Sequence, residues 1–304
     1  MKYLVIGTGG TGGMIASALK LANFDVSVVA RGKHLEQIKQ NGLKIFSDIF
    51  GDHILNIPAY SIDEYKDRPD VIFICTKYYS VSEIIPFIQK VADKSTIIIP
   101  ILNVFGIGSE LQEKISKSII LDGCIYIVSY ISDYGVISHP SKMFKIYFGK
   151  RNGQIVDKKR LENIEQDLKQ TGIEVVLSED ILKDTFSKVT LISPYAACEI
   201  YYDVPIGKMQ QQGKERDLLI KLLEELQQLA NKMNLTLDFD VVERNLKIID
   251  KMHPDTISSL HRDIKNNKNA ELDGQIFKIV ELGQKYGLNM PNYRLVAEKF
   301  GYNE

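Results

Sequence analysis

The chain lacks the features that define several large classes of protein. It has three cysteines in 304 residues, and no two of them have metal-ligand spacing, which argues against a disulfide framework and against a metal site. Its formal net charge is −1, so nothing requires a nucleic acid or an anionic membrane as a partner. The longest apolar run, residues 96–102, is far too short to span a bilayer. Because strand-like sequence begins at residue 2 or 3, we expect no targeting segment, reduced thiols and a cytoplasmic location.

What the chain does have is a strand, a glycine-rich turn and a helix at its start. The apolar run 3–6 and the helix-like segment 14–21 flank a turn with the pattern G-x-G-x-x-G. In this pattern the first glycine permits a tight turn, the second lets a pyrophosphate approach, and the third lets helix and strand pack closely. The helix N-terminus then offers its N–H groups to the phosphates. The predicted cofactor-binding residues of this turn are Gly7, Thr8, Gly9, Gly10, Thr11 and Gly12.

The second strand, over residues 25–30, indicates which dinucleotide binds. NAD-binding domains carry a carboxylate near this point, where it binds the ribose 2′-hydroxyl. Here Arg31 follows the strand, with Lys33 two residues later. A guanidinium can bind a 2′-phosphate with two hydrogen bonds, whereas a carboxylate would repel it. The position therefore favours NADP(H) over NAD(H), although two basic residues also fit a solvated loop.

The order of patterns along the chain predicts two domains. Strand and helix patterns alternate through the first part, which predicts a parallel sheet covered by helices. After about residue 178 only helical patterns follow, over 181–199, 216–233, 239–251 and 256–286. We therefore predict an α/β protein with a Rossmann-type dinucleotide-binding domain over residues 1–177 and an all-helical domain over 178–304. The apolar helices of the second domain fit either a core or the interface of a homodimer.

Three polar residues stand where chemistry is expected. Lys77 and Asn103 come directly after the buried strands 71–75 and 96–102, at the sheet edge where open α/β folds bind ligands, although both also fit ordinary loops. Lys188 lies among apolar neighbours at the start of the helical domain. It is either a surface residue with a covered stem or a partly desolvated amine, whose lowered pKa would suit proton transfer.

Other polar residues give weaker signals. Asp263, Asn267 and Glu271 are spaced four residues apart, so a continuous helix would carry them on one stripe. A polar stripe is usually a solvated face, and only a facing cleft would make it a site. The five histidines are isolated in the sequence, and we predict surface or capping positions for them.

Together these segments resemble the ketopantoate reductase (2-dehydropantoate 2-reductase) family over essentially the whole chain. The order and spacing of the motifs are more specific than any single one. The motifs are Gly7-x-Gly9-x-x-Gly12, Arg31, Thr76-Lys77, Leu102-Asn103-Val104-Phe105-Gly106, Phe186-x-Lys188, Ser258-Ser259-x-x-x-Asp263, Glu271-x-Asp273 and the tail from Gly287 to Pro291.

The resemblance implies a reaction and roles for single residues. The reaction is the NADPH-dependent reduction of a 2-keto acid, in this family 2-dehydropantoate, which is reduced to pantoate in pantothenate biosynthesis. Lys188 matches the general acid, which protonates the developing alkoxide, and Glu271 matches the carboxylate that binds the distal hydroxyl of the substrate. The implied substrate-binding residues are Asn103 and Ser259, and the implied cofactor-side residues are Arg31, Lys77 and Asn103.

The chain departs from the family pattern beside the lysine. Where the family often has asparagines four and eight residues after the lysine, this chain has Ile192 and Ala196, with Ser193 as the candidate replacement for one polar contact. Two alternatives therefore stay open: a paralogous reductase of a more apolar 2-keto acid, and a regulatory protein that binds NADP without turnover. Retention of Lys188 and Glu271 argues against the second, because binding alone needs neither.

Overall fold

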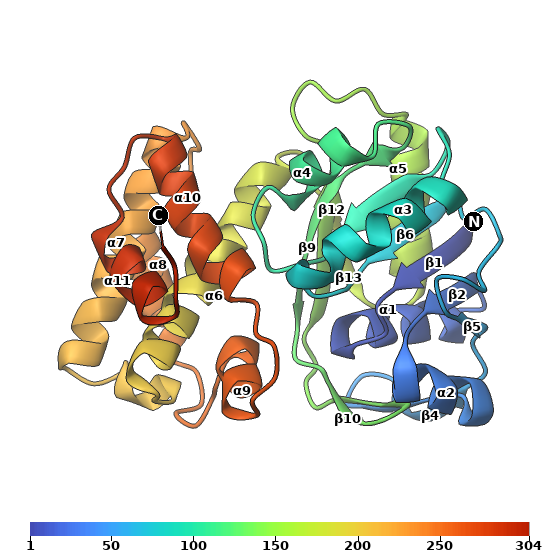
Figure 1. Cartoon of the computed structure of the whole chain (residues 1–304), viewed down its shortest axis with the longest axis horizontal. Coiled ribbons are helices and arrows are strands. Elements are labelled where there is room, and N and C mark those ends of the chain that lie inside the picture. The colour runs from blue at the N-terminus through green and yellow to red at the C-terminus, as the bar shows by residue number, and fades with distance from the viewer. Residues whose placement is uncertain (304) are drawn as a thin grey trace. The chain divides into compact units, whose positions relative to one another are not determined.

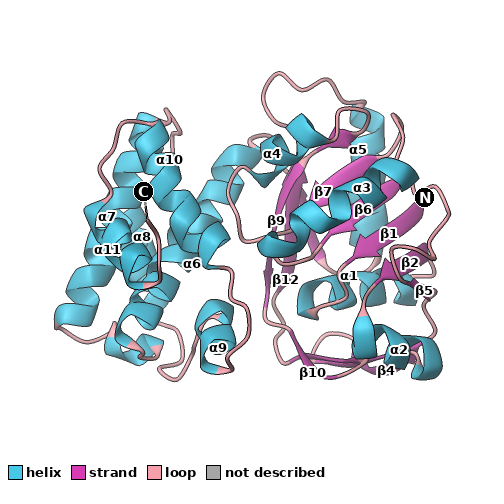
Figure 2. Ribbon diagram, viewed as in Figure 1, coloured by secondary structure: helices cyan, strands magenta, loops and turns pink. Residues whose placement is uncertain are grey.

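The structure is a computed structural model that describes residues 1–303. The chain forms two compact units, the first made of Met1–Leu102 and Gly106–Asp184, and the second of Asn103–Phe105 and the residues from Thr185 onward. Among the described residues, all strands belong to the first unit, and the second is built from helices and loops (Figure 2). No helix in this part of the chain is long and apolar enough to cross a membrane.

A six-stranded parallel sheet forms the centre of the first unit, in the order β5-β2-β1-β6-β7-β8. Its strands β5, β2, β1 and β6 are labelled in Figure 1. Its strands are β1 (Lys2–Ile6), β2 (Asp25–Val29), β5 (Ala59–Tyr60), β6 (Val71–Ile74), β7 (Ile97–Pro100) and β8 (Ile119–Ile120). The apolar runs are buried on both faces of the sheet, which is why they do not alternate with polar residues. Pro100 stands at the end of β7, where a missing N–H disturbs the sheet least. The chain passes from β2 on one side of β1 to β6 on the other, and ligands bind at such reversals.

Helices and two smaller sheets complete the first unit. The helices are α1 (Gly10–Leu21), α2 (Gly32–Asn41), α3 (Val81–Val91), α4 (Ile107–Lys114) and α5 (Lys158–Gln170). A four-stranded sheet has the order β10-β11-β3-β4 and a three-stranded sheet the order β13-β12-β9. Their strands are β3 (Leu43–Ser47), β4 (Gly51–Leu55), β9 (Asp122–Ile127), β10 (Tyr130–Asp133), β11 (Val136–His139), β12 (Phe144–Gly149) and β13 (Glu174–Leu177). One continuous apolar core joins the three sheets, so they fold as one body.

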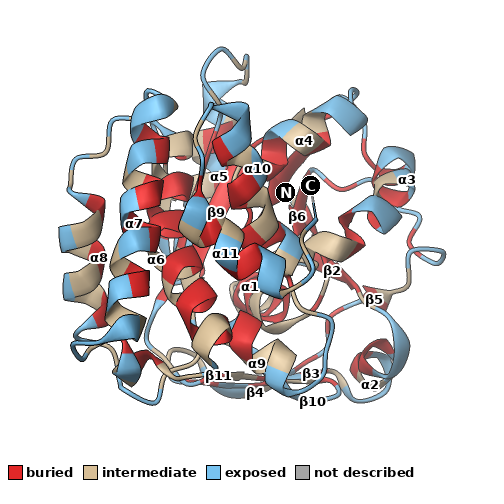
Figure 3. Ribbon diagram, turned by 60° about the vertical axis from the view of Figure 1, so that its left-hand side comes forward, coloured by how far each residue is buried: buried red, intermediate tan, exposed pale blue. Residues whose placement is uncertain are grey.

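The second unit is a group of helices around its own core. They are α6 (Ile181–Tyr202), α7 (Lys214–Lys232), α8 (Val241–Ile249), α9 (Ser259–Lys265), a π-helix (Asp273–Phe277), α10 (Lys278–Lys285) and α11 (Pro291–Lys299). Leucines at helical spacing bury one face of α7, and Figure 3 shows this face distinct from the exposed one. This core shares no buried residue with that of the first unit.

The single helix predicted over 256–286 is wrong. The chain leaves α9 after Lys265, and Asn267 takes a left-handed conformation with φ of 50°. Asparagine tolerates that conformation and is a weak helix former, and three asparagines occur within Asn266–Asn269. Because of this break, Asp263 and Glu271 do not share a stripe of one helix.

Candidate active site

The glycine-rich turn closes tightly between β1 and α1. Gly7 has φ of 92°, a conformation that side chains disfavour, and a Cβ there would lie 2.8 Å from the backbone N of Thr76 at the end of β6. A Cβ at Gly12 would collide with the carbonyl oxygen of Gly7 and lie 2.8 Å from the Cβ of Cys75. Both glycines are thus required for packing, as the pattern predicts.

Gly9 is different, because a Cβ there would meet no atom of the protein within 4 Å. It is the N-cap residue of α1, whose first turn contains no acidic residue and whose cap makes no side-chain hydrogen bond. The turn therefore presents an open backbone at the positive end of a helix, which suits an anionic group.

Buried hydroxyls beside the turn also fit a bound group. Among the described residues, the hydroxyl oxygens of Thr8, Thr76 and Ser129 are buried without a hydrogen-bond partner. A buried polar group normally has a partner, so their side chains suit a site that a ligand completes. Together with the open Gly9, these residues fit the phosphates and ribose of a dinucleotide.

The basic residues follow neighbouring strands of the same sheet. Arg31 is the N-cap of α2 and comes two residues after the end of β2, and Lys77 follows β6. Because β2, β1 and β6 are parallel neighbours, their carboxyl ends bring both residues to the edge that carries the glycine-rich turn. The Arg31 guanidinium is exposed and lies 3.2 Å from the Glu83 carboxylate and 3.4 Å from the Ser80 hydroxyl.

Lys188 and Asn103 meet in the second unit. Lys188 is only 6% exposed, on α6, and its Nζ donates to the Oδ1 of Asn103 over 2.5 Å. The chain segment at Asn103 is held nearby because the ring of Phe105 packs edge-to-face on that of Phe186, with centroids 5.1 Å apart. A buried ammonium with a fixed amide partner is a defined proton donor and a local positive charge.

The segment that carries Glu271 lies beside α6. Glu271 is 5% exposed and lies two residues before the start of the π-helix, a rare geometry that is frequent at functional sites. The hydroxyl of Ser193 donates to the carbonyl oxygen of Gln275 over 2.7 Å and accepts from the Tyr293 hydroxyl over 2.9 Å. These bonds place Ser193, predicted as a substrate contact, in the packing of α6 against the π-helix and α11. Its hydroxyl is used there both as donor and as acceptor.

Ser259 is the remaining predicted substrate residue, and it differs in exposure from its neighbour Ser258. Ser258 caps α9, since its hydroxyl accepts from the backbone N–H of His261 over 3.1 Å, whereas Ser259 is exposed in the first turn. On α6, Ile192 is partly exposed and Ala196 is fully buried in the core. Of the two positions that depart from the family pattern, Ile192 is the one that can contact a ligand.

Sequence reasoning missed the roles of the histidines, three of which are buried rather than at the surface: His34, His139 and His261. His34 accepts from the backbone N–H of Gly135 at Nδ1, over 3.0 Å, so its proton is on Nε2, which donates to the carbonyl of Thr8 over 2.8 Å. Burial lowers the pKa of this imidazole, which keeps it neutral. His34, on α2, is thus hydrogen-bonded to both the glycine-rich turn and the β10–β11 hairpin. No local sequence pattern predicts this contact.

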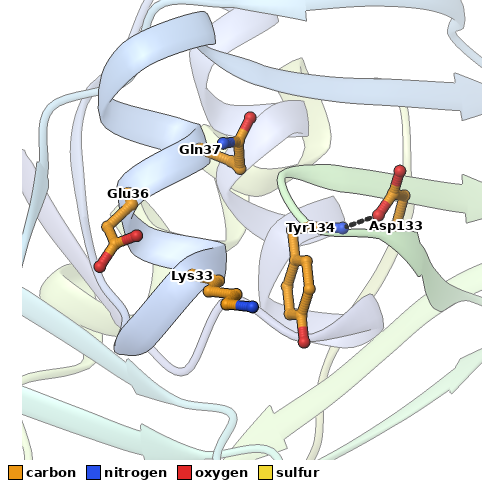
Figure 4. A pocket seen from close by; sticks show the side chains of 5 residues that line it. All are labelled: Lys33, Glu36, Gln37, Asp133 and Tyr134. Carbon is orange, nitrogen blue, oxygen red and sulfur yellow. Dashed lines mark hydrogen bonds between the residues drawn. The ribbon is translucent and has the colours of Figure 1, made fainter.

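An open surface pocket of about 420 Å³ is lined by α2 and the β10–β11 hairpin. Figure 4 shows its lining, in which Lys33, Glu36 and Gln37 come from α2, and Asp133 and Tyr134 come from the β10–β11 hairpin. Apart from Lys33, none of these residues was singled out by the sequence. The lining mixes both charges without a buried polar group, so the pocket does not define a site of its own.

A parallel sheet that reverses its strand order at a glycine-rich turn is the fold of dinucleotide-dependent oxidoreductases, and the buried lysine of the helical unit suits a proton-transfer step. The chain belongs to the ketopantoate reductase family. The family model described as ketopantoate reductase PanE/ApbA matches residues 3–153, and its C-terminal counterpart matches residues 180–301. The protein is accordingly an NADP-dependent oxidoreductase of the CH–OH group that reduces 2-keto acids.

Individual relatives span nearly the whole chain. An uncharacterized oxidoreductase of Bacillus subtilis, YkpB, is 28% identical, with 96% of this chain and 95% of the relative covered. The 2-dehydropantoate 2-reductase of Aquifex aeolicus is 22% identical, with 98% and 95% covered. Among solved structures, 2-dehydropantoate 2-reductase from Methylococcus capsulatus has a TM-score of 0.87 at 20% identity, covering 99% of this chain and 96% of that one. A D-mandelate dehydrogenase solved with NADH and anilino(oxo)acetate has a TM-score of 0.86 at 19% identity, with 98% and 96% covered. At these identities the solved structures show that the fold is shared.

Proposed function

We propose that the protein reduces 2-dehydropantoate to pantoate with NADPH, the reductive step of pantothenate biosynthesis, and that Lys188 is its general acid. The observation that carries the proposal is the hydrogen bond from Nζ of the buried Lys188 to Oδ1 of Asn103. A lysine buried to 6% exposure costs free energy, and a catalytic role explains why the chain keeps it among apolar residues.

We assign a separate role in the reaction to each of four residues of the second unit. The bound nicotinamide supplies the hydride. The Lys188 ammonium gives a proton to the oxygen of the former keto group and stabilises the negative charge that develops there. Asn103 accepts a hydrogen bond from this ammonium and so fixes its direction. Ser259 binds the substrate carboxylate, and Glu271 accepts a hydrogen bond from the distal hydroxyl.

The residues of the first unit hold the cofactor. The turn from Gly7 to Gly12 binds the pyrophosphate, as the open Gly9 backbone allows. Arg31 binds the 2′-phosphate and exchanges its contact with Glu83 for the stronger charge of a phosphate. Lys77 contacts the cofactor from the end of β6.

A more apolar 2-keto acid is a second candidate substrate, and Ile192 favours it. This residue stands one turn beyond Lys188 and is partly exposed, whereas Ser193 is bonded within the helix packing and cannot replace the missing amide. A substrate hydroxyl left without a partner costs about 1–3 kcal/mol. Weaker use of 2-dehydropantoate than is typical of the family, and better use of a plain branched keto acid, would follow.

One experiment separates these substrates. Oxidation of NADPH, followed by the loss of nicotinamide absorbance, gives kcat/KM for 2-dehydropantoate and for 2-ketoisovalerate, which lacks the hydroxyl. A ratio strongly in favour of 2-dehydropantoate supports the first candidate, and a ratio near one supports the second. Absence of turnover with both, and with a wider panel of 2-keto acids, would contradict the proposal.

A homodimer is part of the proposal. A ketopantoate reductase from Staphylococcus aureus, with a TM-score of 0.83 at 16% identity, is described as dimeric. Sedimentation equilibrium would show a mass twice that of the chain, and a monomer at micromolar concentration would contradict this part.

A further inference from the structure

A proline interrupts the hydrogen bonding of the helix that carries Lys188. Pro194 lies inside α6, and it has no N–H to give to the carbonyl group four residues before it, which is that of Thr190. The proline ring also crowds this carbonyl group. The backbone oxygen that loses its ordinary helical partner is therefore only two residues beyond the lysine.

A side chain of another helix supplies the missing donor. Asn245 on α8 is fully buried, and its Nδ2 donates to the carbonyl oxygen of Thr190 over 2.9 Å and to the Thr190 hydroxyl over 3.1 Å. The Thr190 hydroxyl in turn donates to the carbonyl oxygen of Ser187 over 2.8 Å. One amide thus holds, directly or through the Thr190 hydroxyl, backbone groups on both sides of Lys188.

We propose that Asn245 is a positioning residue, which fixes the backbone of α6 around Lys188 so that the ammonium keeps its hydrogen bond to Asn103. The bonds from Asn245 reach Thr190 and, through its hydroxyl, Ser187, the residue directly before the lysine. Without the amide, the Thr190 carbonyl would be buried and unpaired, and α6 would shift or bend to find a donor. A shift of about 1 Å in a catalytic group can cost about a hundredfold in rate.

The inference rests on the proposed role of Lys188, yet it makes a separate statement about the helix. If the proline creates the need for Asn245, then restoring the N–H at position 194 removes that need. The alternative is that Asn245 is only one more packing residue, in which case its loss lowers the melting temperature and leaves the rate per folded molecule unchanged.

A double-mutant cycle on the whole protein tests this. We expect Asn245→Leu, a change to an apolar side chain of similar size, to lower kcat about tenfold or more, with rates expressed per NADPH-binding site, and with the Kd for NADPH unchanged. In the Pro194→Ala background, the same change should lower kcat by no more than about threefold, because the alanine N–H then pairs with the Thr190 carbonyl. Gln210→Leu is the control, since this side chain also donates its amide to two backbone carbonyls, those of Ile249 and Met252, and should affect stability alone.

The outcomes are distinct. An equal loss of kcat in both backgrounds, or no loss in either, overturns the inference. If Asn245→Leu cannot be purified alone, Asn245→Ala takes its place in both backgrounds. A loss of kcat of about tenfold or more that falls to about threefold or less in the Pro194→Ala background supports the inference, and any other pattern overturns it. Failure of the proposed function would instead be seen as undiminished turnover of a Lys188 variant, which the cycle does not measure.

Discussion

Two glycines of the same turn should respond in opposite ways to the same added methyl group. At Gly9 a Cβ meets no atom within 4 Å, and φ of −67° is acceptable to alanine. Gly9→Ala should therefore keep or slightly raise the melting temperature, because alanine in a compatible conformation stabilises by about 0.4–1 kcal/mol. At Gly12 a Cβ collides with the carbonyl oxygen of Gly7, a backbone atom that cannot rotate away.

The magnitudes follow from these contacts. In Gly12→Ala, overpacking against the backbone should lower the free energy of unfolding by about 3 kcal/mol, the upper end of the usual range. For a unit of this size the melting temperature should then fall by roughly 6–12 °C. In Gly9→Ala the methyl group would instead occupy the space in which we propose that the pyrophosphate binds. Loss of one charge-assisted hydrogen bond, about 1.5–3 kcal/mol, weakens NADPH binding by roughly tenfold or more.

The assay needs two measurements on each variant. Scanning calorimetry without ligand gives the melting temperature, and the fluorescence of bound NADPH gives its Kd, with no tryptophan in the chain to interfere. Wild-type affinity in Gly9→Ala would refute the placement of the pyrophosphate. Wild-type stability in Gly12→Ala would refute the packing argument.

Three further predictions concern the cofactor, the substrate and pH. Arg31→Ala should weaken the binding of NADPH about tenfold or more and that of NADH little. Glu83→Gln should strengthen the binding of NADPH, because the carboxylate 3.2 Å from the guanidinium competes with the 2′-phosphate, and equal effects on the affinity for both cofactors would contradict the assignment. Ile192→Asn should raise the kcat/KM ratio of 2-dehydropantoate to 2-ketoisovalerate by roughly tenfold, and an unchanged ratio would place residue 192 outside the pocket. Burial raises the pKa of Glu199 from 4.5 to about 7, so between these pH values the native state retains a proton that the unfolded chain has lost, and the free energy of unfolding should fall as pH rises. Denaturant unfolding should give Glu199→Gln the same free energy of unfolding as wild type near pH 4 and a value about 3 kcal/mol higher at pH 8.

The sequence predicted the parts of the molecule that depend on local pattern. The buried strands read as continuous apolar runs, and α6 and α7 show helical spacing of their apolar residues. The role of each glycine in the turn could be predicted separately, because each position has its own steric requirement. In the structure a Cβ would be too close to neighbouring backbone atoms at Gly7 and at Gly12.

The parts that depend on distant contacts could not be predicted. Asn103 and Lys188 are 85 residues apart, and only the fold brings amide and ammonium together. The Ser193 hydroxyl accepts a hydrogen bond from Tyr293, 100 residues later, although its place between the two positions that depart from the family pattern made Ser193 a candidate for the pocket. The break at Asn267 is a different case, because its cause is local: the flanking apolar residues keep helical spacing through it, and that spacing masks the weak helix propensity of the asparagines.

The central claim is that Lys188 donates the proton, and turnover of Lys188→Met tests it most directly. Methionine keeps the length and the apolar stem of the side chain, and Lys232→Met is the matched control, since Lys232 is exposed in the same unit. With saturating NADPH and the better of the two keto acids, we predict that kcat of Lys188→Met falls by about a hundredfold or more while the Kd for NADPH and the rate of the control stay unchanged. A kcat within a few-fold of wild type would contradict the account.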